Sequence, residues 1–150
     1  QLGRQLSKEE AKKIINEAAE EGLVHFVDNV ASKVKHNCNC CGCACWNVGL
    51  IKRRKIPRDD LMAVYFIRQM DPDSCTGCEN CVDICPVDAI QIKDGIAVVD
   101  KTWCIGCGVC ATRCDFEAVK IVQREDREPI QPDFASLHRQ ISKERDASGT

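Results

Sequence analysis

Eight cysteines in two runs of identical spacing carry the clearest chemical signal in this chain. Within each run the cysteines are separated by two, two and three residues, and the runs are Cys75, Cys78, Cys81, Cys85 and Cys104, Cys107, Cys110, Cys114. A tight loop with the first three cysteines of such a run can bring three thiolates to one [4Fe–4S] cube, whose four irons each take one thiolate. The spacing therefore favours the binding of two iron–sulfur cubes.

The fourth cysteine of each run is expected to bind the cube of the other run. The three-residue step carries the chain away from its own loop, and this spacing with a following proline, here Pro86, is typical of such an exchange. The assignment is cluster I on Cys75, Cys78, Cys81 and Cys114, and cluster II on Cys85, Cys104, Cys107 and Cys110. Because each half supplies a ligand to the other, neither half should fold alone.

An internal repeat underlies the two runs. A shift of 29 residues superimposes the cysteines, Gly77 on Gly106, and residues 89–92 on residues 118–121. The repeated Ala-Ile/Val-x-Ile predicts a short strand after each run. The first of these strands should belong to a β-hairpin, because Asp94-Gly95 follows it as a two-residue turn signal and a second apolar segment comes next.

Residues 64–125 resemble the bacterial ferredoxins that hold two [4Fe–4S] clusters. The resemblance implies an α+β fold of pseudo-two-fold hairpins and short helices, in which a first strand at 64–70 pairs with a last strand at 119–124. A structural zinc site fits less well, since it closes with four ligands and leaves no role for a third cysteine in each loop. A disulfide framework needs an oxidising compartment, and the chain shows no apolar signal-peptide core at its start.

A second group of cysteines lies upstream, five thiols within eight residues: Cys38, Cys40, Cys41, Cys43 and Cys45. Such a density indicates a metal site. We predict a third [4Fe–4S] cluster, cluster III, because four of the five thiols would satisfy one cube and Gly42 would permit the sharp bend around it. Zinc held by four of the thiols and a redox-active thiol pair are the alternatives, and His36 is an outside candidate ligand.

The N-terminal unit, residues 1–47, is predicted to combine this cysteine group with a helix and a short strand. Ser7-x-x-Glu10 is a capping box for an amphipathic helix over 7–21, whose apolar stripe we expect to pack on its own domain. The apolar segment 23–27 follows as the strand.

Two further segments flank the ferredoxin-like region. Residues 48–63 are predicted to be a connector, and their basic run at 52–55 could dock an acidic partner. Residues 126–150 form a polar tail, in which Asp133 could cap a short helix with a small apolar side. We expect that side to lie on a partner or on the ferredoxin-like surface.

The composition excludes several classes of protein. The 150 residues carry a net charge of −2, which argues against a nucleic-acid role, and no run of about 18 apolar residues could span a membrane. With 13 cysteines and few aromatic residues, metal–thiolate bonds should supply much of the stability. Since reduced cubes and free thiols react with oxygen, a cytoplasmic and anaerobic setting is expected.

The N-terminal part also resembles small iron–sulfur proteins of anaerobic bacteria, in which a compact cysteine cluster precedes a two-cluster ferredoxin. The resemblance rests on Gly22-Leu-Val-His25 followed by Cys38-Asn-Cys-Cys-Gly-Cys43. It implies an electron-transfer subunit of a larger oxidoreductase, such as the small partner of tungsten-containing class II benzoyl-CoA reductases or of tungsten aldehyde oxidoreductases. Relatives of this kind carry cysteine where this chain has Ala44, so one spare thiol is missing.

A non-catalytic electron carrier is the favoured function, because no nucleophile–base pair or phosphate loop accompanies the cysteines. It would relay electrons through three [4Fe–4S] clusters to or from a larger catalytic subunit. The alternative is a free ferredoxin shuttle with two clusters and a structural zinc or redox-thiol module.

Three residues beside the ligands are expected to tune or shield the cubes. Asp115 stands where the first run has Pro86, and its charge should lower the potential of cluster I unless it is merely a loop or capping residue. Trp46 and Trp103 adjoin ligand cysteines and should shield the cubes from water, with ordinary packing as the alternative.

Overall fold

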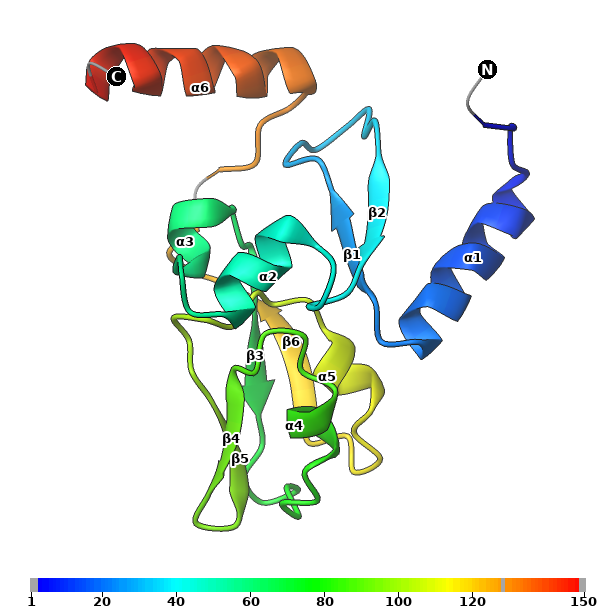
Figure 1. Cartoon of the computed structure of the whole chain (residues 1–150), viewed down its shortest axis with the longest axis vertical. Coiled ribbons are helices and arrows are strands. Elements are labelled where there is room, and N and C mark those ends of the chain that lie inside the picture. Colours follow the sequence, from blue (N-terminus) through cyan, green and yellow to red (C-terminus); the bar gives the residue numbers. More distant parts are fainter. Residues whose placement is uncertain (1–2, 128, 149–150) are drawn as a thin grey trace.

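The computed structural model describes residues 3–127 and 129–148 and shows a mixed α+β chain (Figure 1). Within the described residues the strands form three separate two-stranded antiparallel sheets. Short helices lie among the sheets, while two longer helices, one near each end of the chain, lie at the periphery. The predicted α+β class, with short hairpins, is thus observed.

The ferredoxin-like region contains two of the sheets and two one-turn helices. The strand pairs are β3 (Phe66–Met70) with β6 (Val119–Gln123), and β4 (Ile90–Lys93) with β5 (Ile96–Val99). The helices are α4 (Asn80–Asp83) and α5 (Val109–Thr112). Asp94 and Gly95 both have positive φ, 50° and 80°, as the tight turn between β4 and β5 requires. The predicted hairpin and the predicted pairing of the first and last strands are both confirmed.

The internal repeat is visible in the backbone as well as in the sequence. Left-handed φ angles occur at three pairs of positions 29 residues apart: Gly77 and Gly106 (67° and 63°), Glu79 and Gly108 (67° and 81°), and Asp88 and Glu117 (50° and 50°). A Cβ at Gly77 would overlap the Gly95 carbonyl, and one at Gly106 would overlap the Phe66 carbonyl. The two cysteine loops therefore follow the same backbone path.

Helix α1 (Lys8–Glu20) begins at the predicted capping box. The Glu10 N–H donates to the Ser7 hydroxyl at 3.1 Å, and the Ser7 N–H donates to the Glu10 carboxylate at 2.9 Å. The expectation that the apolar stripe packs on its own domain was wrong over most of its length, since Ile14 and Ile15 stay 42% and 37% exposed and only Ala18 is buried. The physical reason is that α1 extends away from the sheets (Figure 1).

The predicted strand after α1 is confirmed as β1 (Val24–Val27), but its partner was not predicted. Strand β2 (Asn37–Cys40) pairs with β1 and places Cys38 opposite Phe26 and Cys40 opposite Val24. A sequence of alternating Asn and Cys has neither branched nor aromatic residues, so it lacks the usual strand signal.

Residues 48–63 are more than the predicted connector. They form most of α2 (Trp46–Lys52) and all of α3 (Arg58–Leu61), and the side chains of Val48 and Ile51 are 0% exposed. The basic run and Pro57 concealed this apolar pair, which lies three residues apart on one helix face.

The tail ends in α6 (Phe134–Ser148), longer than the short helix predicted. Asp133 caps it as expected, since its carboxylate accepts from the Ser136 N–H at 2.8 Å. The start of the helix contacts the loop after β1: the Ser32 hydroxyl donates to the Pro132 carbonyl at 2.8 Å, and the Lys35 ammonium lies 4.3 Å from the Phe134 ring centre. The start of α6 therefore lies on the N-terminal segment, which was not expected, and a partner for its apolar side stays a prediction.

One hydrophobic cluster joins the N-terminal segment to the cysteine loops. It consists of small aliphatic residues and cysteines, among them Val24, Val48, Ile51, Cys81, Cys85, Val87 and Cys110. Thiols thus fill positions that aliphatic side chains fill in other small cores. The domain boundaries at residues 47 and 63 stay a prediction. The hydrophobic cluster contains residues from both sides of each boundary. Among the described helices, none combines the length and apolarity that crossing a bilayer demands.

Candidate metal centres

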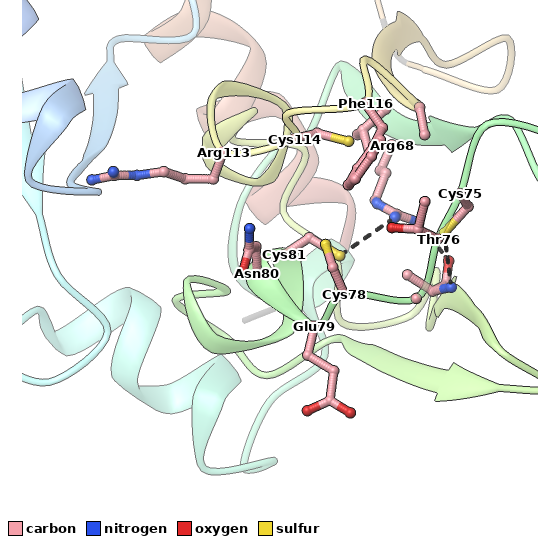
Figure 2. A pocket seen from close by; sticks show the side chains of 14 residues that line it. Arg68, Cys75, Thr76, Cys78, Glu79, Asn80, Cys81, Arg113, Cys114 and Phe116 are labelled. Atoms are coloured by element: carbon pink, nitrogen blue, oxygen red, sulfur yellow. Dashed lines mark hydrogen bonds between the residues drawn. The ribbon is translucent and has the colours of Figure 1, made fainter.

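The four cysteines assigned to cluster I line one cavity (Figure 2). Cys75 and Cys78 come from the loop after β3, Cys81 from α4, and Cys114 from the loop after α5. Cysteines from both halves of the repeat face one space, which is the arrangement that exchange of the fourth ligand needs. Which thiolates bind iron stays a prediction, and the shared cavity supports it.

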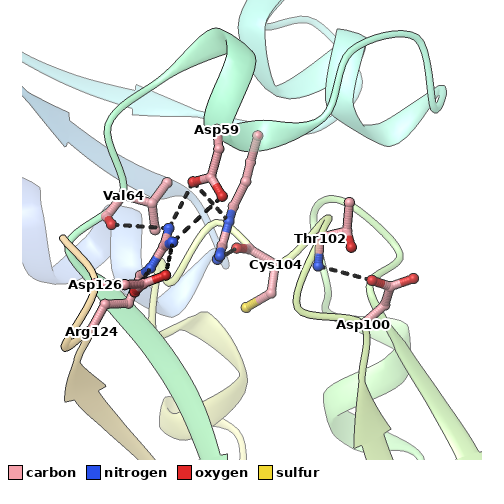
Figure 3. A network of polar contacts seen from close by, with 8 residues as sticks. Asp59, Val64, Asp100, Thr102, Cys104, Arg124 and Asp126 are labelled. Carbon is pink, nitrogen blue, oxygen red and sulfur yellow. Dashed lines mark hydrogen bonds and ion pairs between the residues drawn. The ribbon is translucent and has the colours of Figure 1, made fainter. Parts of the chain in front are cut away.

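Each cysteine loop is closed by an aspartate four residues before its first cysteine. One Asp71 carboxylate oxygen accepts from the Asp73 N–H at 3.1 Å, and the other accepts from the Ser74 hydroxyl at 2.7 Å. The Ser74 bond, followed by the Asp73 bond, lowers the pKa of Asp71. The group that accepts these two bonds is therefore the ionised carboxylate. Asp100 accepts in the same way from the Thr102 N–H at 2.9 Å (Figure 3). The repeat thus extends to the bonds that shape the loops.

Backbone amides donate to the sulfurs of Cys75 and Cys85, one in each predicted ligand set. The Ala97 N–H lies 3.5 Å from Cys75 Sγ, and the Ala89 N–H lies 3.3 Å from Cys85 Sγ. Hydrogen bonds to the ligand sulfurs are one of the means by which a protein sets the potential of an iron–sulfur cluster. Thiols within an apolar cavity, with amides aimed at the sulfurs, therefore fit a [4Fe–4S] cube.

The cysteines assigned to cluster II also influence one another. Burial, with added contributions from the neighbouring thiols Cys110, Cys85 and Cys104, raises the pKa of Cys107 to about 12. Burial likewise raises the pKa of Cys110 to about 11, with added contributions from Cys104 and Cys85. All four sulfurs of the predicted set are therefore close enough to interact. Thiols of this kind hold their protons until a metal binds, so metal binding must release protons.

Buried and half-buried arginines support the loop of cluster II. Arg58, 4% exposed, donates to the Cys104 carbonyl and lies 3.3 Å from the Asp59 carboxylate. Arg124 bridges Asp59 at 2.7 Å and Asp126 at 2.9 Å (Figure 3). Sequence reasoning missed this network, because Arg58 and Asp59 lie in the segment that was taken for a connector.

The basic run at 52–55 also turns toward the cluster II loop. Arg54 donates to the Val87 carbonyl at 2.8 Å and to the Asp88 carbonyl at 2.6 Å, and its guanidinium lies 4.7 Å from the Trp103 ring centre. Lys52 forms an ion pair with Asp88 at 3.5 Å. Two of the four cations of the predicted docking patch are thus engaged within the chain.

The upstream cysteines form a group beside cluster II. Burial, followed by the neighbouring thiols Cys45 and Cys38, raises the pKa of Cys40 to about 11. Cys41 and Cys43 are joined by a disulfide, which leaves Cys38, Cys40 and Cys45 as free thiols. A cube on four of the five would require this disulfide to be reduced. Within the described residues no three His, Cys, Asp or Glu side chains are arranged as ligands of one metal ion, either here or in the two paired runs, so the cube and the zinc ion both stay predictions for this group.

Other residues named from the sequence lie outside the metal centres or at their edge. His36 Nδ1 lies 2.7 Å from the carboxylate of the buried Asp28. Trp46 is 74% exposed and cannot shield a cube, so the expectation for it was wrong, whereas Trp103 packs against the hydrophobic cluster. Asp115 is exposed and accepts from the Asn80 amide at 3.5 Å.

Comparison with known proteins agrees with the geometry of the loops. Residues 69–91 and 97–120 each match the family described as 4Fe-4S binding domain, and each matched segment contains one cysteine run. The chain therefore carries two 4Fe-4S binding motifs.

Several similar proteins are named ferredoxins. An uncharacterised ferredoxin of Methanocaldococcus jannaschii is 56% identical over 39 residues, which are 23% of this chain and 26% of that protein. A probable ferredoxin of Methanosarcina thermophila is 47% identical over 38 residues, 25% of this chain and 66% of that protein. A ferredoxin-2 of Desulfomicrobium norvegicum is 48% identical over 29 residues, 19% of this chain and 49% of that protein. The chain thus spans between about a quarter and two thirds of the length of these relatives.

Proposed function

We propose that this chain is an electron carrier that holds cluster I and cluster II as [4Fe–4S] cubes on its eight paired cysteines. The observation that carries the proposal is the shared cavity, in which Cys114 lies with Cys75, Cys78 and Cys81 although it belongs to the other half of the repeat. A bound cube supplies one-electron redox chemistry. The chain supplies thiolates, amide donors and burial.

The buried and the exposed ligand cysteines have different tasks in the proposed role. Cys81, Cys85 and Cys110 are each only 8% exposed, and they would keep water from the inner faces of the cubes. Cys78 is exposed, and the neighbouring Phe116, which lines the same cavity, is 50% exposed. We place electron exchange with other carriers at this edge of cluster I, where the ligand lies nearest to the surface.

The third [4Fe–4S] cluster remains part of the proposal, held by four of the five upstream cysteines. Its support is position: Gly42, in the middle of the group, lies against Pro86, the residue after the cluster II ligand Cys85. Electrons would then pass in the order III, II, I or the reverse. The partner that we propose is a larger catalytic oxidoreductase subunit, of the tungsten-containing kind that the sequence resemblance implies. The exposed apolar side chains of α1 and α6 would suit such a partner.

The test is metal analysis of protein purified without oxygen, with electron paramagnetic resonance after reduction by dithionite. Two cubes give about eight irons per chain and three give about twelve. We expect Cys114→Ala to lose the signal of cluster I, because it removes a ligand from the far half of the repeat. The matched variant Cys43→Ala keeps all eight paired cysteines and should retain the signals of both cluster I and cluster II. A colourless wild-type protein with no signal would refute the proposal.

The same preparation decides between the relay and the shuttle. Co-elution with a large subunit and about twelve irons support the relay. A lone monomer with about eight irons and one zinc supports the alternative of a free shuttle with a zinc module.

A further inference from the structure

Arg68 is a buried cation without a carboxylate partner. It is the central residue of β3, and it is 3% exposed. Its Nη1 donates to the Ala97 carbonyl at 3.0 Å, its Nη2 lies 3.8 Å from Cys81 Sγ, and its Nε finds no hydrogen-bond partner among the described residues. In the part of the chain that the structure describes, no Asp or Glu forms an ion pair with it.

An isolated buried charge is strongly unfavourable unless another charge compensates it. The cavity that Arg68 lines is the one that the four cluster I cysteines share (Figure 2). A cube with four thiolates is an anion, and it would supply the missing counter-charge there.

Only the first half of the internal repeat has a cation at this position. A shift of 29 residues places Arg68 on Ala97, which is 2% exposed at the equivalent inward position of β5. The small Ala97 side chain leaves room for the guanidinium, which reaches the Ala97 backbone carbonyl from the other half of the repeat. The two clusters therefore have different electrostatic surroundings although their loops follow the same path.

We propose that Arg68 is a positioning residue whose buried charge raises the reduction potential of cluster I relative to that of cluster II. This inference rests on the proposed function. Reduction adds one electron to an anionic cube, and a cation beside its ligand sulfur stabilises the more negative state. Cluster I receives the direct contact at Cys81. Among the described residues Arg68 donates no hydrogen bond to a cluster II cysteine, so the shift of cluster II is smaller.

The test is an anaerobic redox titration followed by electron paramagnetic resonance, on proteins whose iron content has first been shown to equal that of the wild type. Arg68→Met removes the charge and keeps a long side chain. We expect the ratio of reduced to oxidised cluster I at a fixed applied potential to fall by about tenfold or more, which is about 59 mV for one electron. Arg68→Lys should recover most of this loss. Arg139→Met, on α6, makes the same change in net charge far from the clusters and should leave both potentials unchanged.

Unchanged potentials in an iron-loaded Arg68→Met protein would overturn the inference and leave the proposed function intact. A wild-type protein without iron would instead overturn the proposed function. Should Arg68→Met fail to retain iron, pulsed electron paramagnetic resonance of the reduced wild type, labelled with ¹⁵N-arginine, decides the matter. A nitrogen coupling that Arg68→Lys abolishes supports the contact with cluster I, and a spectrum without arginine coupling overturns it.

Discussion

Gly42 lies against the backbone carbonyl of Pro86, so closely that a Cβ at position 42 would overlap the Pro86 oxygen and would lie 3.3 Å from Lys52 Cδ. The contact joins the upstream cysteine group to the loop that follows Cys85. Only a residue without a side chain permits this approach of two backbones. Gly42 therefore fixes the position of the upstream cysteines relative to cluster II, in addition to the local bend expected of it.

Gly42→Ala should destabilise the protein by about 1–3 kcal/mol, because the added methyl group must push one of the two loops aside. The matched variant is Gly3→Ala, since a Cβ at Gly3 meets nothing within 4 Å. Thermal unfolding under argon, followed by the visible absorbance of the clusters, measures the difference. Equal midpoints for Gly42→Ala and the wild type would show that the loops do not pack in this way.

Arg54→Met should also destabilise the protein, by about 1–2 kcal/mol, through loss of its bonds to the Val87 and Asp88 carbonyls and of its contact with Trp103. Arg53→Met is the matched control, because it removes the neighbouring exposed charge from the same basic run. The comparison uses urea unfolding midpoints measured without oxygen. If both variants behave alike, the basic run acts only as a charged surface.

Asp115→Asn should change the potential of cluster I much less than Arg68→Met does. Asp115 is exposed and near Asn80, so water and salt screen its charge, whereas Arg68 acts from a buried position. We expect the reduced-to-oxidised ratio at fixed potential to change by about threefold or less. A tenfold change in the titration would instead restore the larger effect that the sequence suggested for this carboxylate.

The Arg124 network should make stability depend on acid pH. The Arg124 guanidinium lowers the pKa of Asp126 to about 2 and also lowers that of Asp59. Depressed carboxyl pKa values stabilise the fold above their ordinary value near 3.8, and this contribution disappears as the pH falls from about 4 toward 2.

Arg124→Met should therefore have a lower thermal midpoint than the wild type at pH 7, and the gap should close as the pH falls through this window. The difference between the two proteins is the quantity to follow, since acid also protonates the thiolates that hold iron. Arg139→Met serves as the control for net charge. A gap that persists at the lowest pH would mean that Arg124 stabilises the fold by packing and not by charge.

Several features of the fold, inside and outside the ferredoxin-like region, could be predicted because their signals are local. The Asp94-Gly95 turn, the Ser7 and Glu10 capping box and the Asp133 cap each depend on a few neighbouring residues, and each is present in the fold. Strand β2 and the core role of Val48 and Ile51 were missed for the opposite reason. Their environment comes from distant segments of the chain, and their own sequence does not indicate it.

The sequence by itself determined that this chain has two cysteine loops of equal spacing, because the ligands of one cube come mainly from one short segment, whose gaps are visible in the order of residues. Only the tertiary structure decided what surrounds those loops. It placed the upstream cysteines against Pro86, and it buried Arg68 beside the Cys81 sulfur, where no carboxylate of the described residues pairs with it. Burial and charge at a metal centre depend on which distant residues pack there, and residue spacing carries no record of that packing.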